Sequence, residues 1–175
     1  QVQNADGGQV FNVDTNDANL INNPANPSFE VNTAGWALRN GASGATTIAR
    51  DTSKQKYGLA SLLVTADNHT GNGARYTLAS GSWPAGSYMV SFSMLNAGTA
   101  FAAAPTVLFG NGSDNACAAV SPNVIPSTSG WTRYSAACTF SGTTTSIIVA
   151  QNEATAHTFY VDAVQLETGS TATAY

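Results

Sequence analysis

The chain has 175 residues, a formal net charge of -4 and a charged fraction of 9%, well below the roughly 25% that is usual for soluble domains. Its 43% hydrophobic residues suffice for the core of one domain. The basic residues are few and scattered, which excludes nucleic acid as a partner. The apolar runs are short and interrupted, which excludes a membrane-spanning helix. Such a neutral, polar exterior is expected on a virion surface or on another extracellular protein.

The first 19 residues are expected to form an extended N-terminal arm, which precedes one domain over residues 20–175. Val10, Phe11 and Val13 form a β-like alternating stretch in this arm, and a tail that is exposed to solvent needs no such pattern. One interpretation is that the arm adds a strand to a neighbouring subunit through the backbone of an edge strand. The other is that it packs on its own domain as an additional edge strand.

The rest of the chain has the pattern of an all-β protein. Clusters of Gly, Asn, Asp, Ser and Pro separate short runs rich in β-forming residues, and no stretch has a helical period of 3.6 residues. We expect two packed antiparallel sheets. The predicted strands lie near residues 28–31, 36–39, 45–51, 61–66, 74–78, 87–95, 106–109, 116–120, 132–140, 146–150 and 158–166.

The chain has two cysteines, Cys117 and Cys138, in what we interpret as neighbouring strands. A disulfide between them would close a loop of about 20 residues and stabilise the fold by roughly 3 kcal/mol. The alternative is a pair of buried free thiols that pack as small apolar residues. A zinc site is disfavoured because no CxxC motif and no nearby histidine accompanies them.

Several short motifs occur in an order typical of one fold family. An N-P-S-F-E segment at residues 26–30 is followed by Gly35-Trp36, and the last predicted strand contains Y-V-D-A-V-Q-L-E at 160–167. The segments A-G-S-Y at 85–88 and W-T-R-Y at 131–134 lie between them. This set resembles carbohydrate-binding modules of the galactose-binding-like type. The resemblance implies a two-sheet antiparallel jelly-roll β-sandwich with the N-terminal arm outside it.

The C-terminal sequence Q-L-E-T-G-S-T-A-T-A-Y, at residues 165–175, carries a narrower resemblance. It is similar to the ends of such domains in tail, fibre and other structural proteins of tailed bacteriophages. The resemblance implies a virion protein whose partners are other copies of itself or other virion proteins, reached through the arm.

In many members of this family, two acids hold a structural calcium ion together with backbone carbonyls. The matching positions are Glu30 and Asp162, with the carbonyls of residues 54–61. Calcium takes six to eight oxygen ligands, so this set is workable. The alternative is that both acids accept hydrogen bonds from the neighbouring loop or pair with Lys54 or Lys56.

A glycan surface in such a module needs aromatic rings that stack on sugars and polar groups that bind hydroxyls. Trp83 follows Gly81-Ser82 and precedes Pro84, in an expected turn, and is predicted to be exposed. The other candidates for glycan binding are Arg75, Tyr76 and Asn111. Trp36 and Trp131 are expected to pack in the core.

No residue pattern indicates a catalytic reaction, and neither a nucleophile elbow nor a metalloprotease motif is present. We therefore expect a protein that is not an enzyme. The first interpretation is a structural component of a virion or other extracellular assembly. The alternative is a glycan-binding module of a secreted or cell-surface bacterial protein.

Overall fold

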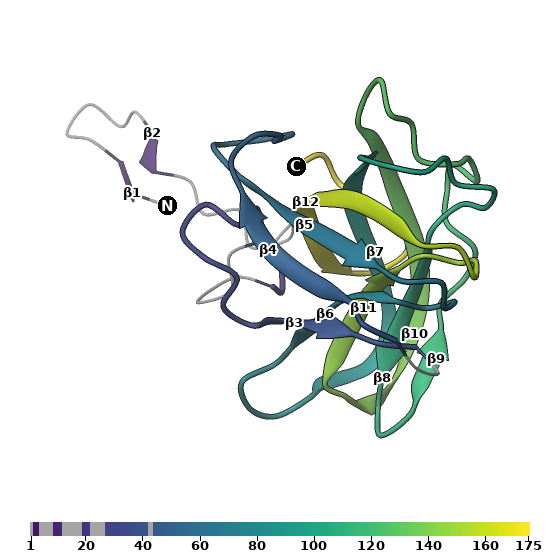
Figure 1. The fold of residues 1–175 in the computed structure, drawn as a ribbon. Coiled ribbons are helices and arrows are strands. Elements are labelled where there is room, and N and C mark those ends of the chain that lie inside the picture. The colour runs from purple at the N-terminus through teal and green to yellow at the C-terminus, as the bar shows by residue number, and fades with distance from the viewer. Residues whose placement is uncertain (1, 4–8, 12–18, 22–26, 42–43) are drawn as a thin grey trace.

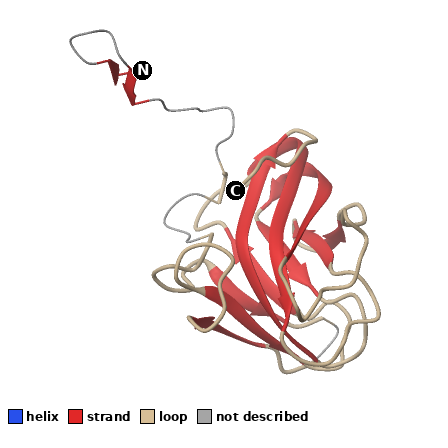
Figure 2. Cartoon of the chain, turned by 90° about the horizontal axis from the view of Figure 1, so that it is seen from above, coloured by secondary structure: helices blue, strands red, loops and turns tan. Residues whose placement is uncertain are grey.

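A computed structural model describes residues 2–3, 9–11, 19–21, 27–41 and 44–175 of the chain. Every regular element among these residues is a β-strand, as Figure 2 shows. No helix in this part of the chain is long and apolar enough to cross a membrane. The strands are β1 (Val2–Gln3), β2 (Gln9–Phe11), β3 (Trp36–Arg39), β4 (Thr47–Asp51), β5 (Ser61–Ala66), β6 (Gly73–Thr77), β7 (Trp83–Asn96), β8 (Thr106–Gly110), β9 (Asp114–Ala116), β10 (Thr132–Thr144), β11 (Ser146–Ala150) and β12 (His157–Thr168).

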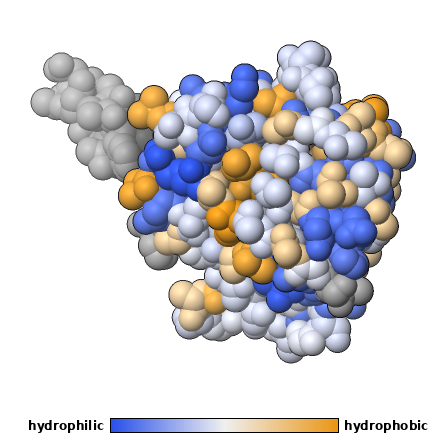
Figure 3. All heavy atoms as spheres, viewed as in Figure 1, coloured by the Kyte–Doolittle hydropathy of each residue, from blue (hydrophilic) through white to orange (hydrophobic). Residues whose placement is uncertain are grey.

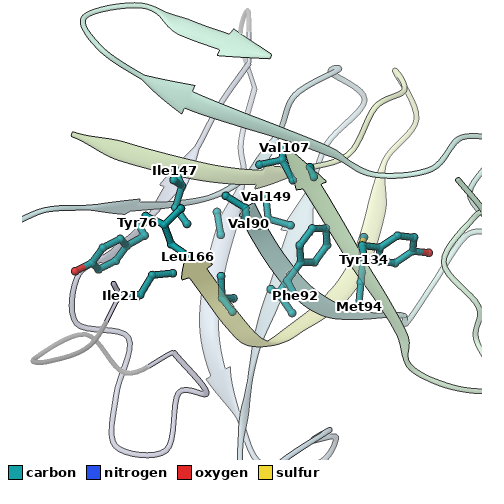
Figure 4. Close-up of a cluster of buried hydrophobic side chains, with 14 of the residues drawn as sticks. Ile21, Tyr76, Val90, Phe92, Met94, Val107, Tyr134, Ile147, Val149 and Leu166 are labelled. Atoms are coloured by element: carbon teal, nitrogen blue, oxygen red, sulfur yellow. The ribbon is translucent and has the colours of Figure 1, made fainter. Parts of the chain in front are cut away.

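Ten of these strands form two five-stranded sheets, which pack face to face (Figure 1). The first sheet has the order β3-β6-β11-β8-β9 and the second has the order β10-β7-β12-β5-β4, and every pair of neighbouring strands in them is antiparallel. Alternate residues of each strand point inward and meet those of the other sheet (Figure 4). The expected two-sheet antiparallel sandwich is confirmed.

The strands of the arm pair with each other and belong to neither large sheet. Val2 pairs with Phe11 and Gln3 pairs with Gln9 in a two-stranded antiparallel sheet. Val10 therefore lies in a strand, as expected, whereas Val13 lies outside the described residues.

The predicted strand at residues 28–31 is wrong. Pro27 and Ser28 lie in a turn and Glu30 and Val31 lie in a bend. Phe29, between them, has a φ of 62°, in the left-handed region that bulky residues rarely adopt. The segment nevertheless lies beside the last strand, because the Pro27 carbonyl accepts a hydrogen bond of 2.9 Å from Val164 N. The motif thus makes a bend beside β12 in place of a strand.

The cysteines form the predicted disulfide, and their Cα atoms are 4.6 Å apart. Cys138 lies in β10, at one edge of the second sheet, whereas Cys117 follows β9, at one edge of the first. The bond therefore joins the two sheets along one side of the sandwich. It does not join two neighbouring strands, because the strand expected at 116–120 ends at Ala116.

The C-terminal segment folds back onto the outward face of the second sheet. Glu167 accepts hydrogen bonds from both Thr173 N and Thr173 Oγ1. The ring of Tyr175 lies 5.9 Å from the Arg133 guanidinium and 5.0 Å from the ring of Tyr57. The residues of the phage-like ending thus have a structural role within this chain.

Candidate functional site

The outward face of the first sheet can be identified from its strand register. Trp36, Tyr76, Ile147 and Phe109 are paired across four strands and all belong to the core cluster. Since successive residues of a strand point to opposite faces, the adjoining row must point outward. That row comprises Ala37, Arg75, Ile148, Leu108 and Ala116.

An ion cluster bridges this outward face from edge to edge. Arg39 on β3 and Arg75 on β6 both donate to Asp114 on β9, with N–O distances of 3.0 and 2.6 Å. Four strand spacings separate β3 from β9, which would be roughly 19 Å in a flat sheet. Arginine and aspartate side chains cannot reach across that distance, so the sheet must curve around this face. The curvature also explains why Ile148, at the centre of the face, is 0% exposed although it lies outside the core cluster.

A small amide cluster adjoins the ion cluster at the turn after β8. Asn115 Nδ2 donates to Asn111 Oδ1 at 2.9 Å and to the carbonyl of Ser113 at 3.0 Å. Two guanidinium groups and one carboxylate are therefore held on one curved face. The amides lie at its edge toward the second sheet, because Asn115 pairs with the inward Phe109 and Asn111 donates to Ser141 Oγ of β10 at 3.4 Å. Planar polar groups of this kind are the ones that bind sugar hydroxyls.

The predicted glycan candidates divide between this face and the core. Arg75 lies on the outward face and Asn111 lies at its edge. Tyr76 is 5% exposed and points inward. The expected exposure of Trp83 is wrong, because its side chain is also 5% exposed. The turn ends at Ser82, so Trp83 is the first residue of β7, and its ring packs 5.7 Å from that of Phe140.

Trp131 is the tryptophan that the core leaves accessible. Trp36 packs in the core as expected, but Trp131 is half-buried and lies outside the core cluster. It precedes β10, and its ring is 6.4 Å from that of Tyr160 on β12. The core expectation for Trp131 is therefore wrong. The alternation of inward and outward residues along β10 predicts an outward position for Trp131. Tyr134 and Ala136 point inward, and Trp131 is an odd number of residues away from both.

Glu30 and Asp162 hold the loop after β4 through its backbone. Asp162 Oδ2 accepts hydrogen bonds from Lys56 N at 2.7 Å and Tyr57 N at 3.0 Å. Glu30 accepts from Leu59 N at 2.7 Å and from Ala60 N at 3.4 Å. This is the hydrogen-bonded arrangement that sequence analysis considered beside calcium.

Calcium would have to compete with these bonds for the same carboxylate oxygens. The described residues contain no group of three or more His, Cys, Asp or Glu side chains that could hold a metal ion. The carboxylate oxygens of Glu30 and Asp162 therefore do not fit a calcium ion in this arrangement. The ion would have to displace the loop N–H groups that they now bind. Structural calcium remains a prediction from the family resemblance.

The environment of Asp162 shifts its titration. The pKa of Asp162 is raised from 3.8 to about 6, chiefly by burial and in smaller part by the nearby Glu30 carboxylate, while three backbone N–H donors oppose the rise. The side chain is 0% exposed. Loss of a proton from this group therefore costs more in the folded chain than in the unfolded one.

No protein-family model and no curated protein matches this sequence. Solved structures do match. The CBM22-1 xylan-binding domain of Paenibacillus barcinonensis Xyn10C aligns with a TM-score of 0.63 and 19% identity, over 83% of this chain and 93% of that one. A further xylan-binding domain of CBM family 22 aligns with a TM-score of 0.62 and 16% identity, over 84% and 95%. The family 11 carbohydrate-binding module of Clostridium thermocellum Lic26A-Cel5E aligns with a TM-score of 0.53 and 14% identity, over 81% and 92%.

The fold is that of carbohydrate-binding β-sandwich modules. The family resemblance is confirmed at the level of the fold. Sequence identities this low support a shared fold but do not identify a ligand. The similar domains are binding modules, in line with an expectation of no catalysis. The disulfide and this fold together suggest an extracellular protein.

Proposed function

We propose that this chain is a non-catalytic carbohydrate-binding module. The observation that supports the proposal is the convergence of Arg39, Arg75 and Asp114, from three strands, over the curved outward face of the first sheet. The xylan-binding domains with the same fold make a plant-type polysaccharide the first ligand to test.

The chemistry of this face suits hydroxyl groups. A guanidinium offers several N–H donors in a fixed plane, and a carboxylate accepts two or more hydrogen bonds. Because Asp114 holds both arginines, their N–H donors are fixed in position before a ligand binds. Binding therefore loses less side-chain conformational entropy. The two guanidinium charges against one carboxylate leave the cluster with a positive formal charge. Neutral and acidic sugars are therefore favoured over amino sugars.

Affinity electrophoresis in gels that contain xylan, mixed-linkage β-glucan, pectin or galactomannan tests the proposal. We expect at least one polysaccharide to retard the chain, and Arg75→Ala to weaken binding about tenfold, since a hydrogen bond from a charged group contributes roughly 1.5–3 kcal/mol. Thr139→Ala is the matched control, because Thr139 is an exposed residue on the other sheet. Equal migration of the chain in all gels and in their blank would contradict the proposal.

A role in a virion or another extracellular assembly is the second candidate. The observation that favours it is the separate pairing of β1 with β2, which leaves the arm outside both sheets of the sandwich. In this version the arm contacts other copies of the chain or other virion proteins, and the sandwich displays its glycan-binding face at a virion surface. The two roles are compatible, because they use different parts of the chain.

A further inference from the structure

The outward face of the second sheet is covered over one part and open over another. The C-terminal segment covers the part near Arg133 and Glu167. The open part contains a row that runs across four strands in register: Ala49, Leu63, Tyr160 and Leu95. Figure 3 shows that hydrophobic residues gather in a band over the region of β4 and β5 of Figure 1. An apolar strip thus lies on a face that the chain's own tail leaves free.

Two aromatic rings lie at one end of this strip. Thr132 pairs with Met94, so the ladder places Trp131 opposite Leu95, next to Tyr160. Trp131 and Tyr160 are both half-buried, and their rings are 6.4 Å apart and tilted by 53°. Both residues are therefore partly accessible to a ligand.

A hollow of about 300 Å³ is lined in part by Tyr160, whose ring neighbours that of Trp131. Its volume is at the lower end of the roughly 300–1,000 Å³ range of small-ligand sites. Tyr160 and Leu95 provide its apolar wall. Lys54 and Thr128, both exposed, provide an ammonium and a hydroxyl group, while the amide of Asn96 is buried and hydrogen-bonded within the loop. The complete lining is Lys54, Leu95, Asn96, Ala97, Gly98, Thr128 and Tyr160.

Hydrogen bonds fix the walls of this hollow. Asn96 donates through its backbone N to the carbonyl of Ser127 at 2.9 Å, and its side chain bonds both Thr99 O and Gly98 N. Ala97 N donates to the carbonyl of Thr158 at 2.9 Å. The site therefore exists without a ligand, and binding need not order a loop.

We infer that this hollow, with Tyr160 and Trp131, is a second carbohydrate site, which binds a single pyranose residue at the end of a neutral or acidic glycan. A pyranose has an apolar ring face for an aromatic side chain and a rim of hydroxyls for Lys54 and Thr128. Lys54 is the one charged residue among those that line the hollow, which disfavours amino sugars. The inference rests on the proposed carbohydrate-binding function but uses the opposite sheet from the ion cluster.

Nuclear magnetic resonance can test this site separately, because the chain has three tryptophans and two of them, Trp36 and Trp83, lie in the core. Methyl β-D-xyloside, methyl β-D-glucoside, methyl β-D-galactoside and methyl β-D-glucuronide are titrated into labelled full-length chain. We expect at least one to shift the indole N–H signal of Trp131 and the amide signals of Ala97 and Gly98, while the other indole signals stay in place. Trp131→Phe assigns the indole signal.

The variants separate this inference from the proposed function. Trp131→Ala and Lys54→Ala should each raise the dissociation constant measured at the Gly98 amide, by about tenfold and threefold respectively. Lys54 is exposed, so its variant remains informative if Trp131→Ala does not fold. Arg75→Ala should leave these shifts unchanged. Failure of all four glycosides to shift the Trp131, Ala97 and Gly98 signals overturns the second site. Polysaccharide binding that depends on Arg75 would then still support the first one, and loss of both would reject the carbohydrate-binding function itself.

Discussion

Asp162 is a buried acid on which the loop after β4 depends. Burial raises its pKa to about 6 from 3.8, so between about pH 4 and pH 6 the folded chain keeps a proton that the unfolded chain releases. The contribution of Asp162 to the free energy of unfolding is therefore highest below about pH 4, and it decreases as the pH rises to about 6. A pKa change of this size corresponds to roughly 3 kcal/mol.

The matched variant for this prediction is Asp162→Asn, which does not titrate and keeps a carbonyl oxygen for Lys56 N and Tyr57 N. Urea unfolding of both proteins at pH 4 and pH 7 measures the effect. We expect the stability of the original chain relative to Asp162→Asn to decrease from pH 4 to pH 7. A constant difference between the two proteins would show that Asp162 titrates alike in the folded and unfolded states.

Calcium at Glu30 and Asp162 is a separate prediction at the same residues. If the ion binds, it must displace loop N–H groups, and a chelator should then lower the melting temperature. A ligand at one hundred times its Kd adds about 2.7 kcal/mol to the native state. Glu30→Gln should abolish the difference between calcium and chelator. Identical melting curves for the original chain in calcium and in chelator would leave the hydrogen-bonded loop as the role of these acids.

The disulfide acts at the scale of the elements, because it joins β10 of one sheet to the segment after β9 of the other. Replacing Cys117 and Cys138 by serine together should lower the free energy of unfolding by roughly 3 kcal/mol, the value expected for a loop of this length. Guanidinium unfolding measures the loss. A double variant as stable as the original under non-reducing conditions would mean that the packed core between the sheets holds them together without the bond.

Strand positions were predictable where turn residues bound an alternating run. The bounds of β3, β5 and β11 agree with those expected at 36–39, 61–66 and 146–150. The strand expected at 28–31 is absent because this segment forms a turn and a bend, with Phe29 at a positive φ. The local sequence does not reveal that conformation for a bulky residue. The motif that suggested a first strand instead supplies the Glu30 carboxylate to the next loop.

The candidate site was less predictable than the strands. Arg75 is among the residues that the sequence analysis proposes for glycan binding. Asp114 and Arg39 are not, because a sheet's curvature brings together residues that are 75 positions apart in the sequence. Trp83 is expected in a turn but is the first residue of β7. An error of one position at the start of a strand is enough to reverse the face to which a side chain points.

At the scale of the whole molecule, the two outward faces differ in chemistry. The face of the first sheet carries an ion cluster over a mostly apolar row, whereas the open part of the second is apolar with two aromatic rings. Opposite faces of one sandwich could therefore contact separate chains of a polysaccharide. A single domain with two such sites would gain apparent affinity for a dense glycan surface through effective concentration.

The boundary between arm and sandwich is set by Asn19. Its side chain donates to Val164 O at 2.9 Å and accepts from Leu166 N at 3.0 Å, and Leu20 N donates to Leu166 O at 2.8 Å. Residues 19–21 thus extend the edge of β12 where β5 has ended. A deletion that tests the arm should therefore stop at residue 18, and one that removes residue 19 should also destabilise the sandwich.

We expect deletion of residues 1–18 to leave the melting temperature unchanged and to abolish self-association or attachment to a particle, as measured by analytical ultracentrifugation and co-sedimentation. Asn19→Ala in the full chain is the opposite control: it should lower the free energy of unfolding by about 1–3 kcal/mol, through the unpaired Leu166 N, and should leave assembly intact. If the chain without residues 1–18 unfolds, the arm is an integral part of the domain. If it folds and the original chain never associates, the arm has no assembly role, and the carbohydrate-binding function stands alone.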